Sequence, residues 1–181
     1  MLAIIKLGGS VISNKAKPFS FRSDAAEIFA VKLSSLLEKG FRLVVVHGGG
    51  SFGHPVALRY RLHEGGSSGE KLRGFAETRY WMTELNQRLI RILLNRGVPA
   101  VAVQTSALAV TERGALSSFH LEPVRRLLEM GLVPVLFGDV VPDTVQGIAV
   151  LSGDAISAYL ACELKANALV FVMGAGGGFS K

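Results

Sequence analysis

The chain has 181 residues, of which 49% are hydrophobic and 19% are charged. This composition is typical of a globular protein with a sizeable core, and it excludes a disordered chain. The apolar runs at 43–46 and 169–173 are far shorter than a membrane span, and the N-terminus passes into a predicted strand without a signal-peptide pattern. We therefore expect a soluble, cytoplasmic protein with no membrane partner.

The formal net charge is +6, from 20 Lys and Arg against 14 Asp and Glu, which suits an anionic ligand. The basic residues are spread along predicted helices, without the dense tract or interleaved aromatic residues of nucleic-acid-binding modules, so no nucleic-acid partner is expected. The single cysteine, Cys162, excludes an intrachain disulfide. Its apolar helical context predicts a small core residue.

Strands and helices alternate from the N-terminus. The first predicted strand, 2–7, is stopped by Gly8-Gly9-Ser10. A loop then leads to a helix over 23–39, with Ser23 or Asp24 as its cap and Glu27 in capping-box position. The apolar side of this helix is expected to carry Ile28, Val31 and Leu36.

The second predicted strand, 41–46, ends in the loop HGGGSFGH, residues 47–54. A loop without Cβ atoms lets a ligand touch the backbone, and its N–H groups can converge on an anion. The helix expected to start near His54 would add its positive end. Because a strand-helix-strand unit brings both glycine turns to the same edge of a parallel sheet, we predict a phosphate-handling site there.

Beyond this loop, the Gly/Ser-rich segment 63–69 is expected to be a mobile loop over the site or a simple connector. A long helix over 75–95 follows, and its apolar residues at helical spacing are Met82, Leu85, Leu89, Ile92 and Leu93. A strand over 99–104 and a short helix over 121–130 come next.

The last third of the chain repeats the strand-end pattern. A strand over 133–137 ends at Gly138-Asp139, residues 140–150 are typical of a hairpin or an excursion at the sheet edge, and Ser152-Gly153-Asp154 opens a helix to about Lys165. The fifth strand covers 168–173. This alternation indicates a single α/β domain over 1–181 with a mostly parallel sheet.

Gly48, Gly50 and Gly53 formally match the dinucleotide-binding pattern G-x-G-x-x-G. The match lacks its context, because no acidic residue ends a following strand about twenty positions later. The P-loop pattern is absent, and the histidines at 47, 54, 63 and 120 do not fall at zinc-ligand spacing. A dinucleotide fold is therefore the weaker alternative.

Two lysines, the glycine turns and one carboxylate together meet the needs of phosphoryl transfer. Lys6 stands just before the first glycine turn, Lys15 lies in the following loop, and Asp154 comes at a helix start. Transfer requires positive charge and N–H donors around the phosphoryl group. Singly, a strand-end lysine is usually solvated and an Asp at a helix start is usually a cap, so the hypothesis depends on their conjunction.

In this order, four segments resemble the amino acid kinase superfamily: Lys6-Leu7-Gly8-Gly9-Ser10, the loop 47–54, Phe137-Gly138-Asp139 and Ser152-Gly153-Asp154. Within it, Ser10-Val11-Ile12 followed by Lys15, and a glycine loop ending in histidine, are most similar to the isopentenyl phosphate kinases. The resemblance covers residues 1 to about 173. It implies an open αβα sandwich, phosphorylation of isopentenyl phosphate to the diphosphate by ATP with Mg²⁺, and usually a homodimer.

The resemblance also implies roles for single residues. The nucleotide's phosphates and the transferring group would meet Lys6, Gly8, Gly9, Ser10 and Gly50. The acceptor's monophosphate would meet Gly49, His54, Gly138 and Gly153. Catalysis would need Lys6, Lys15, Asp154 and His54, with Asp154 orienting the lysines. A histidine suits a phosphate acceptor because, unlike a carboxylate, it does not repel it. His47 is expected to pack or to orient the loop.

The acceptor's hydrocarbon tail would need an apolar pocket beside the phosphate. The candidate walls lie on the two helices after the glycine loop: Val56, Tyr60, Phe75, Met82 and Leu85. The competing interpretation is that these residues are ordinary core at helical spacing.

The chain departs from the resembling kinases after its fifth strand, where they have an acidic, glycine-containing turn and further elements that bind adenine. Here residues 174–181 are GAGGGFSK, without an aspartate. We expect the acceptor half of the fold with the nucleotide-binding half mostly absent, as a fragment or a shortened relative. Two other hypotheses stay open: a non-catalytic phosphometabolite-binding or regulatory domain, and another small-molecule kinase of the superfamily.

Overall fold

The computed structural model describes residues 1–14 and 16–174 of the chain. Within them, five parallel strands form a central sheet in the order β3-β6-β2-β1-β9. Their bounds are Leu2–Leu7 (β1), Arg42–His47 (β2), Ala100–Ala102 (β3), Val133–Phe137 (β6) and Ala168–Val172 (β9). All five strands predicted for this sheet are confirmed, within one or two residues at most ends.

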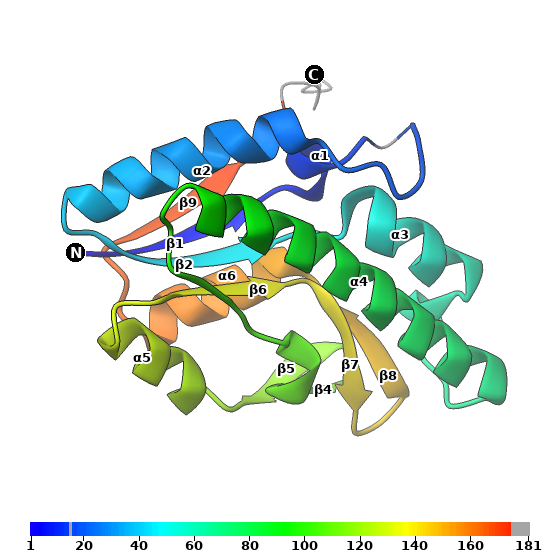
Figure 1. Ribbon diagram of the computed structural model, residues 1–181. Helices are drawn as coiled ribbons and strands as arrows, with labels where there is room; N and C mark the ends of the chain where they lie inside the picture. The colour runs from blue at the N-terminus through cyan, green and yellow to red at the C-terminus, as the bar shows by residue number, and fades with distance from the viewer. Residues whose placement is uncertain (15, 175–181) are drawn as a thin grey trace, which may run out of the picture.

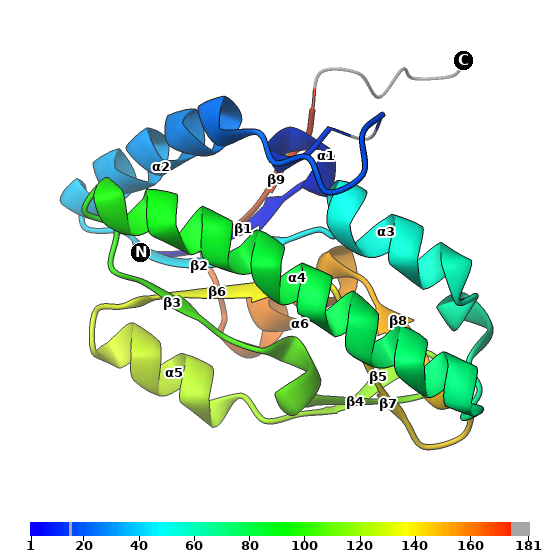
Figure 2. The ribbon, with the colours of Figure 1, turned by 45° about the vertical axis from the view of Figure 1, so that its right-hand side comes forward.

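Helices cover both faces of the central sheet (Figure 1). Their bounds are Gly9–Ile12 (α1), Ser23–Glu38 (α2), Gly50–Arg59 (α3), Gly69–Asn95 (α4), Glu122–Glu129 (α5) and Gly153–Glu163 (α6). One core lies between the sheet and α2 and α4, and the other lies between the sheet and α5 and α6 (Figure 2). The predicted αβα sandwich is confirmed.

Alternate residues of one strand enter the two cores. On β2, Val45 packs with α2 and α4, whereas Val44 and Val46 pack with α5 and α6. Both sets are fully buried, which is why β2 is a continuous apolar run rather than an alternating one. Among the described residues, no helix is long and apolar enough to cross a bilayer.

A second, four-stranded sheet lies beside the first in the order β5-β4-β7-β8. Its bounds are Ala109–Glu112 (β4), Ala115–Phe119 (β5), Asp139–Asp143 (β7) and Gly147–Leu151 (β8). The predicted hairpin over 140–150 is β7 and β8. The hairpin of β4 and β5 was not predicted, because β5 is mostly exposed and the register shifts between Val110 and Thr111.

Asp143 joins the two hairpins. Its carboxylate accepts hydrogen bonds from the Thr111 hydroxyl (2.8 Å) and from the N–H groups of Gly114 (2.8 Å) and Gln146 (2.9 Å). Burial raises the pKa of Asp143, but the N–H donors and the Thr111 hydroxyl outweigh it and hold the pKa well below its ordinary value. The carboxylate is therefore ionised, and it adds side-chain bonds at the point where β7 pairs with β4, Thr111 opposite Asp143.

Helix α2 presents a different side to the core from the one predicted. Ile28 is 66% exposed and Val31 is 49% exposed. The buried side consists of Ala26, Phe29, Ala30 and Leu33. Two of these four residues are alanines, so small residues as well as large apolar ones form its inner side. The capping box is also absent: Arg22 is the N-cap without a side-chain bond, and Glu27 pairs with Arg96 (2.6 Å).

Cys162 is exposed on α6, contrary to the prediction of a core residue. The inner side of α6 is taken by Ile156, Ser157 and Leu160, and residue 162 falls outside that spacing. Helix α4 begins at Gly69, six residues before the predicted start, with the Ser68 side chain accepting a hydrogen bond from the Lys71 N–H. The segment 63–69 joins the 3-10 helix Leu62–Glu64 to α4, and its Gly66 N–H donates to the Gln146 carbonyl (2.7 Å).

Candidate active site

A cleft of about 780 Å³ opens at the carboxyl ends of the central strands. Backbone hydrogen bonds tie these ends together. The Gly8 N–H donates to the Val172 carbonyl (2.8 Å), the Gly48 N–H to the Leu7 carbonyl (2.9 Å), and the Gly138 N–H to the His47 carbonyl (2.9 Å). The strand-end glycines therefore meet at one edge of the sheet, as predicted from the parallel topology. No residue of 63–69 lines this cleft, so the connector interpretation of that segment fits the structure.

Lys6 and Asp154 meet at the floor of the cleft. The Lys6 Nζ lies 3.0 Å from the Asp154 Oδ1, and the side chains are 14% and 62% exposed. Ser152, not Asp154, caps α6, since its hydroxyl accepts a hydrogen bond from the Ala155 N–H (3.1 Å). The Asp154 carboxylate is thus left to orient a lysine that points into the cleft from β1.

The two glycine loops touch each other through their backbones. A Cβ on Gly9 would lie 2.6 Å from the Cα of Gly50, and one on Gly50 would lie 2.6 Å from the Gly9 carbonyl oxygen. Gly50 also has a φ of +48°, which favours glycine. These glycines are therefore required by packing between the loops as well as by access of a ligand.

Helix α3 begins at Gly50, four residues before the predicted start near His54. The segment Gly50–Gly53 contains few helix-forming residues, so its helical conformation comes from tertiary packing, in which Phe52 is fully buried. The N–H groups of Ser51, Phe52 and Gly53 already donate within the protein. The loop therefore offers an anion fewer N–H donors than its sequence indicated.

His54 lies in the first half of α3 and lines the cleft. A Cβ on Gly49 would be 3.3 Å from both the His54 Cδ2 and the Met82 Sδ, so the imidazole ring lies against this glycine. On the facing wall, a Cβ on Gly138 would be 2.8 Å from the Gly153 nitrogen. The four residues that the resemblance places around a monophosphate all line this cleft.

His47 is buried below the loop and does not line the cleft. Asn86 donates from Nδ2 to His47 Nε2 (3.1 Å), which leaves the His47 Nδ1–H to donate to the Gly48 carbonyl (3.1 Å). Burial lowers the pKa of His47 to about 4, and the bond to Gly48 opposes this only in part. His47 is therefore neutral near pH 7 and packs beneath the loop instead of adding charge to it.

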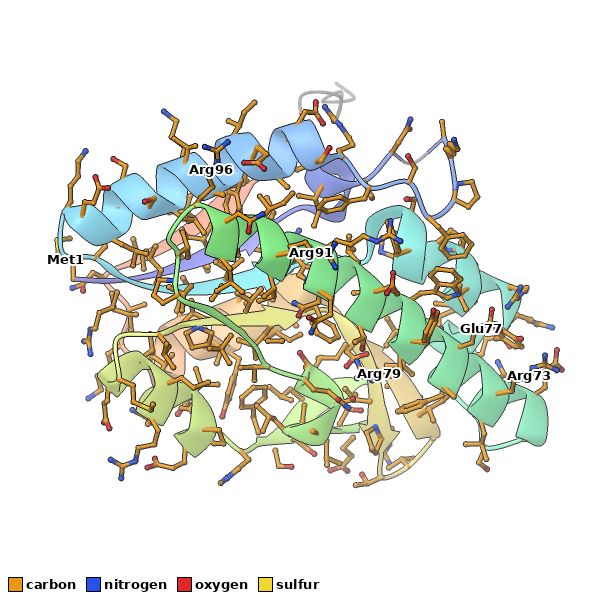
Figure 3. The ribbon with its side chains drawn as sticks, in the orientation of Figure 1. Met1, Arg73, Glu77, Arg79, Arg91 and Arg96 are labelled. Carbon is orange, nitrogen blue, oxygen red and sulfur yellow. The ribbon has the colours of Figure 1, made fainter. Side chains whose placement is uncertain are left out.

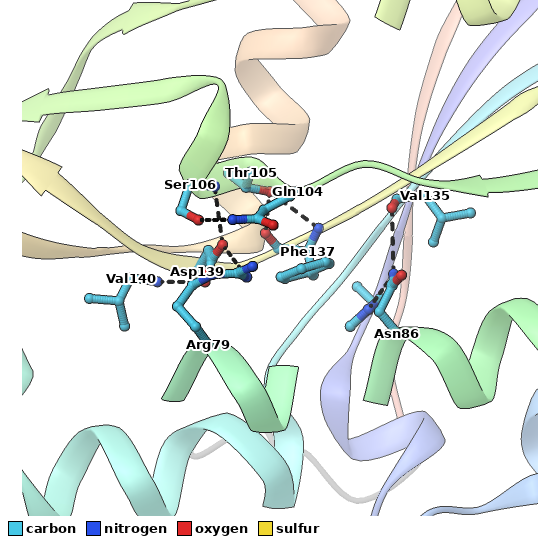
Figure 4. Close-up of polar contacts among 10 residues, drawn as sticks. Arg79, Asn86, Gln104, Thr105, Ser106, Val135, Phe137, Asp139 and Val140 are labelled. Carbon is cyan, nitrogen blue, oxygen red and sulfur yellow. Dashed lines mark hydrogen bonds and ion pairs between the residues drawn. The ribbon is translucent and has the colours of Figure 1, made fainter. Parts of the chain in front are cut away.

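A buried ion pair joins Arg79 of α4, labelled in Figure 3, to Asp139 at the start of β7 (Figure 4). The Arg79 Nη1 lies 2.7 Å from the Asp139 Oδ2, which also accepts the Ser106 N–H (3.1 Å), and Oδ1 accepts the Val140 N–H (2.9 Å). Burial raises the pKa of Asp139 to about 6, while Arg79 and Ser106 act in the opposite direction. Asp139 lines the cleft and was not predicted as a site residue.

Sequence reasoning missed the polar residues of α4. Thr78 and Asn86 stand at helical spacing with Met82 on an otherwise apolar, buried side. The Thr78 Oγ1 and Asn86 Oδ1 have no hydrogen-bond partner among the described residues. Polar residues at helical spacing on the inner side of a long helix were the signal in the sequence, because a polar group is rarely buried without a function or a partner.

One end of the cleft is apolar, and it is lined by Ala57, Met82, Val140 and Val150 beside Thr78. Of the five predicted walls of a tail pocket, only Met82 lines it. The other four are core: Leu85 packs between sheet and helices, Val56 is buried, and Tyr60 and Phe75 pack around Leu62. The remaining walls come from Val140 and Val150 of the β7–β8 hairpin, from Ala57 of α3 and from Thr78 of α4.

The glycine turn after β1 also lines the cleft, with Gly8, Gly9 and Ser10 beside Gly50, together with Ser13, Asn14 and Arg22, which were not predicted. Lys15 and residues 175–181 lie outside the described residues. Within the described part of the chain, no group of three or more His, Cys, Asp or Glu residues could hold a metal ion.

Comparison with known proteins gives a consistent result. Residues 1–177 match the model of the amino acid kinase family. The chain is 38% identical over 182 residues to the isopentenyl phosphate kinase of Methanocaldococcus jannaschii, and 36% identical over 176 residues to that of Methanothermobacter thermautotrophicus. These matches cover 94% and 93% of the chain but 68% and 65% of the two enzymes.

The fold matches a solved structure of the same kind. The product complex of the Thermoplasma acidophilum isopentenyl phosphate kinase superposes with a TM-score of 0.89 at 32% identity, over 100% of this chain and 74% of that one. The chain thus spans about two thirds to three quarters of the length of the relatives it matches.

Proposed function

Because this chain belongs to the amino acid kinase family and to its isopentenyl phosphate kinase branch, we propose that it transfers the γ-phosphoryl group of ATP to isopentenyl phosphate. The observation that carries the proposal is one cleft with an oriented lysine at one end and a histidine beside an apolar pocket at the other. That arrangement suits an anion with a short hydrocarbon tail.

At the donor end, Lys6 would hold the transferring phosphoryl group, with the backbone of Gly8, Gly9, Ser10 and Gly50 around the nucleotide's phosphates. Asp154 fixes the direction of the Lys6 ammonium, so that its charge is in place before the negative charge shifts during transfer. Lys15 is proposed as a second cation on the strength of the resemblance alone.

At the acceptor end, His54 would hydrogen-bond the monophosphate beside the backbone of Gly49, Gly138 and Gly153, which line the same cleft. The hydrocarbon tail would lie against Met82 and the β7–β8 hairpin. An acceptor phosphate oxygen held here can attack the γ-phosphorus in line, and the protein need supply only position and charge.

Mg²⁺ is proposed to enter with ATP. The described residues contain no carboxylate cluster for a resident ion, and Mg²⁺ bound to nucleotides takes most of its ligands from phosphates and water. A single domain over 1–181, a homodimer and a cytoplasmic location are also proposed. The two cores share the same central strands, which supports a single domain.

The test is turnover of isopentenyl phosphate with ATP and Mg²⁺, measured by ADP release and by ³¹P NMR of the diphosphate. Lys6→Met should lower kcat by at least about a hundredfold, the usual effect of removing a charge from the transferring group. His54→Ala should raise the KM for isopentenyl phosphate, and His54→Gln should recover part of it by restoring an N–H donor.

The alternatives give different results. A carboxylate acceptor would make the His54→Ala change nearly silent, which would favour another kinase of the superfamily. Calorimetry that detects binding of isopentenyl phosphate but not of ATP, together with no turnover, would favour a phosphometabolite-binding domain. No binding of either ligand would refute the proposal.

A further inference from the structure

The residues that join α1 to α2, of which 13–14 and 16–22 are described, form a strap beside the cleft. Its two ends are held together by the bridge between Ser13 and Phe21 and by the Arg22 N–H, which donates to the Ile12 carbonyl (2.9 Å). Three strap residues line the cleft: Ser13, Asn14 and Arg22. The strap therefore forms part of the donor-end wall.

The strap is bound to the first turn of α3 through Ser51. The Ser51 N–H donates to the Ser13 Oγ (2.9 Å), its Oγ accepts the Ser20 N–H (3.3 Å), and its carbonyl accepts the Phe19 N–H (3.1 Å). In a regular helix that carbonyl would accept the N–H of the residue four positions later, which is Pro55 and has none. The Phe19 N–H takes the vacant acceptor, so Pro55 creates the docking position.

The tip of the strap is held by aromatic packing. The Phe19 ring stacks on Trp81 of α4 at 3.9 Å and 25°, and it meets Phe52 edge-on at 6.0 Å. Phe19 has a φ of +53°, a left-handed conformation that is unfavourable for a bulky side chain. The strained backbone is retained because the ring is seated between α3 and α4.

We propose that the Phe19–Trp81 stack is a latch that positions the strap, so that Asn14 and Arg22 face the nucleotide end of the cleft. Trp81 and Phe19 are positioning residues in this proposal, not catalytic ones. Loss of the stack frees the Phe19 backbone to relax, and the bonds to Ser51 then open more often. The kinetic part of the argument rests on the proposed kinase function, whereas the structural part does not.

The structural part is tested by hydrogen exchange, without any turnover. In Trp81→Ala, the amides of Phe19 and Ser20 should exchange about tenfold faster, the effect expected from losing one well-stacked aromatic pair. Trp81→Phe should restore most of the protection, since it keeps an aromatic face. The control is Tyr80→Ala, because Tyr80 is 60% exposed and touches only the edge of Trp81 (5.1 Å). Equal exchange in Trp81→Ala and Tyr80→Ala would overturn the latch.

Calorimetric and kinetic measurements test what the latch does. Trp81→Ala should raise the KM for ATP several-fold, or lower kcat, while the calorimetric Kd for isopentenyl phosphate stays unchanged, because the strap residues that line the cleft, Ser13, Asn14 and Arg22, are not among those proposed to hold the acceptor. Trp81→Phe should recover the ATP parameters. An equal loss of affinity for ATP and for isopentenyl phosphate would show that the substitution damages the fold as a whole, and it would overturn the positioning role. Absence of turnover in the wild type would refute the kinase function alone, since the exchange result still decides the latch.

Discussion

Replacing Asp139 by asparagine tests how much free energy it costs the folded protein to ionise a buried carboxyl group beside the cleft. Burial raises the pKa of Asp139 from 3.8 to about 6, in spite of Arg79. Since each tenfold change in an ionisation constant corresponds to about 1.4 kcal/mol, ionising Asp139 costs the folded state about 3 kcal/mol more than it costs the unfolded chain. The folded pKa is the higher one, so the cost is absent below about pH 4, grows as pH rises, and is complete above about pH 6.

Asparagine does not ionise, so the variant escapes this cost. The unfolding free energy of Asp139→Asn minus that of the wild type should therefore increase by about 2.5 kcal/mol between pH 4 and pH 7, most of the total cost. At low pH the wild-type carboxyl is also neutral, so neither protein then gives Arg79 a counter-charge. The baseline is the pH-independent difference between an amide and a protonated carboxyl group at this position, which can be negative without altering the increase.

The assay is urea unfolding followed by far-UV circular dichroism at pH 4, 5, 6 and 7 and constant ionic strength, with linear extrapolation to water. Other carboxylates titrate alike in both proteins and cancel in the difference. A difference that stays flat across this range, with equal m-values, would refute the argument that burial dominates Arg79 at this position.

Three further substitutions test other features of the fold. Asp143→Asn should lose stability at pH 7, because the pKa of Asp143 lies well below its ordinary value and the ionised form stabilises the fold. The difference from the wild type should shrink only below about pH 4, as the folded carboxylate becomes protonated, and thermal midpoints at pH 7 and pH 2 check this. Thr78→Val should stabilise the protein by about 1 kcal/mol by removing an unpartnered hydroxyl, with exposed Thr83→Val as the silent control in the same urea assay. Gly9→Ala should cost at least about 2 kcal/mol in unfolding free energy through overlap with the Gly50 backbone, and Gly69→Ala, which meets open space, should not.

The sequence by itself determined the layout of the site. Strand ends were visible because buried parallel strands are continuous apolar runs, and the runs of β1, β2 and β6 are each followed by a glycine. Parallel order then places Gly8, Gly48 and Gly138 at one edge, where the structure links them by hydrogen bonds. Lys6 and Asp154 could be expected to meet for the same reason, since one ends a strand and the other opens a helix at that edge.

Only the tertiary structure decided which contacts complete the site. The inner side of α2 includes two alanines, which local hydrophobicity ranks below the exposed Ile28 and Val31, because the packing of the helix on the core decides which of its sides is buried. The Arg79–Asp139 pair joins residues sixty positions apart, and the Phe19–Trp81 stack joins a loop to a helix far along the chain. Local patterns carry periodicity and turn chemistry, whereas such long-range pairs depend on how the layers pack, which no single segment encodes.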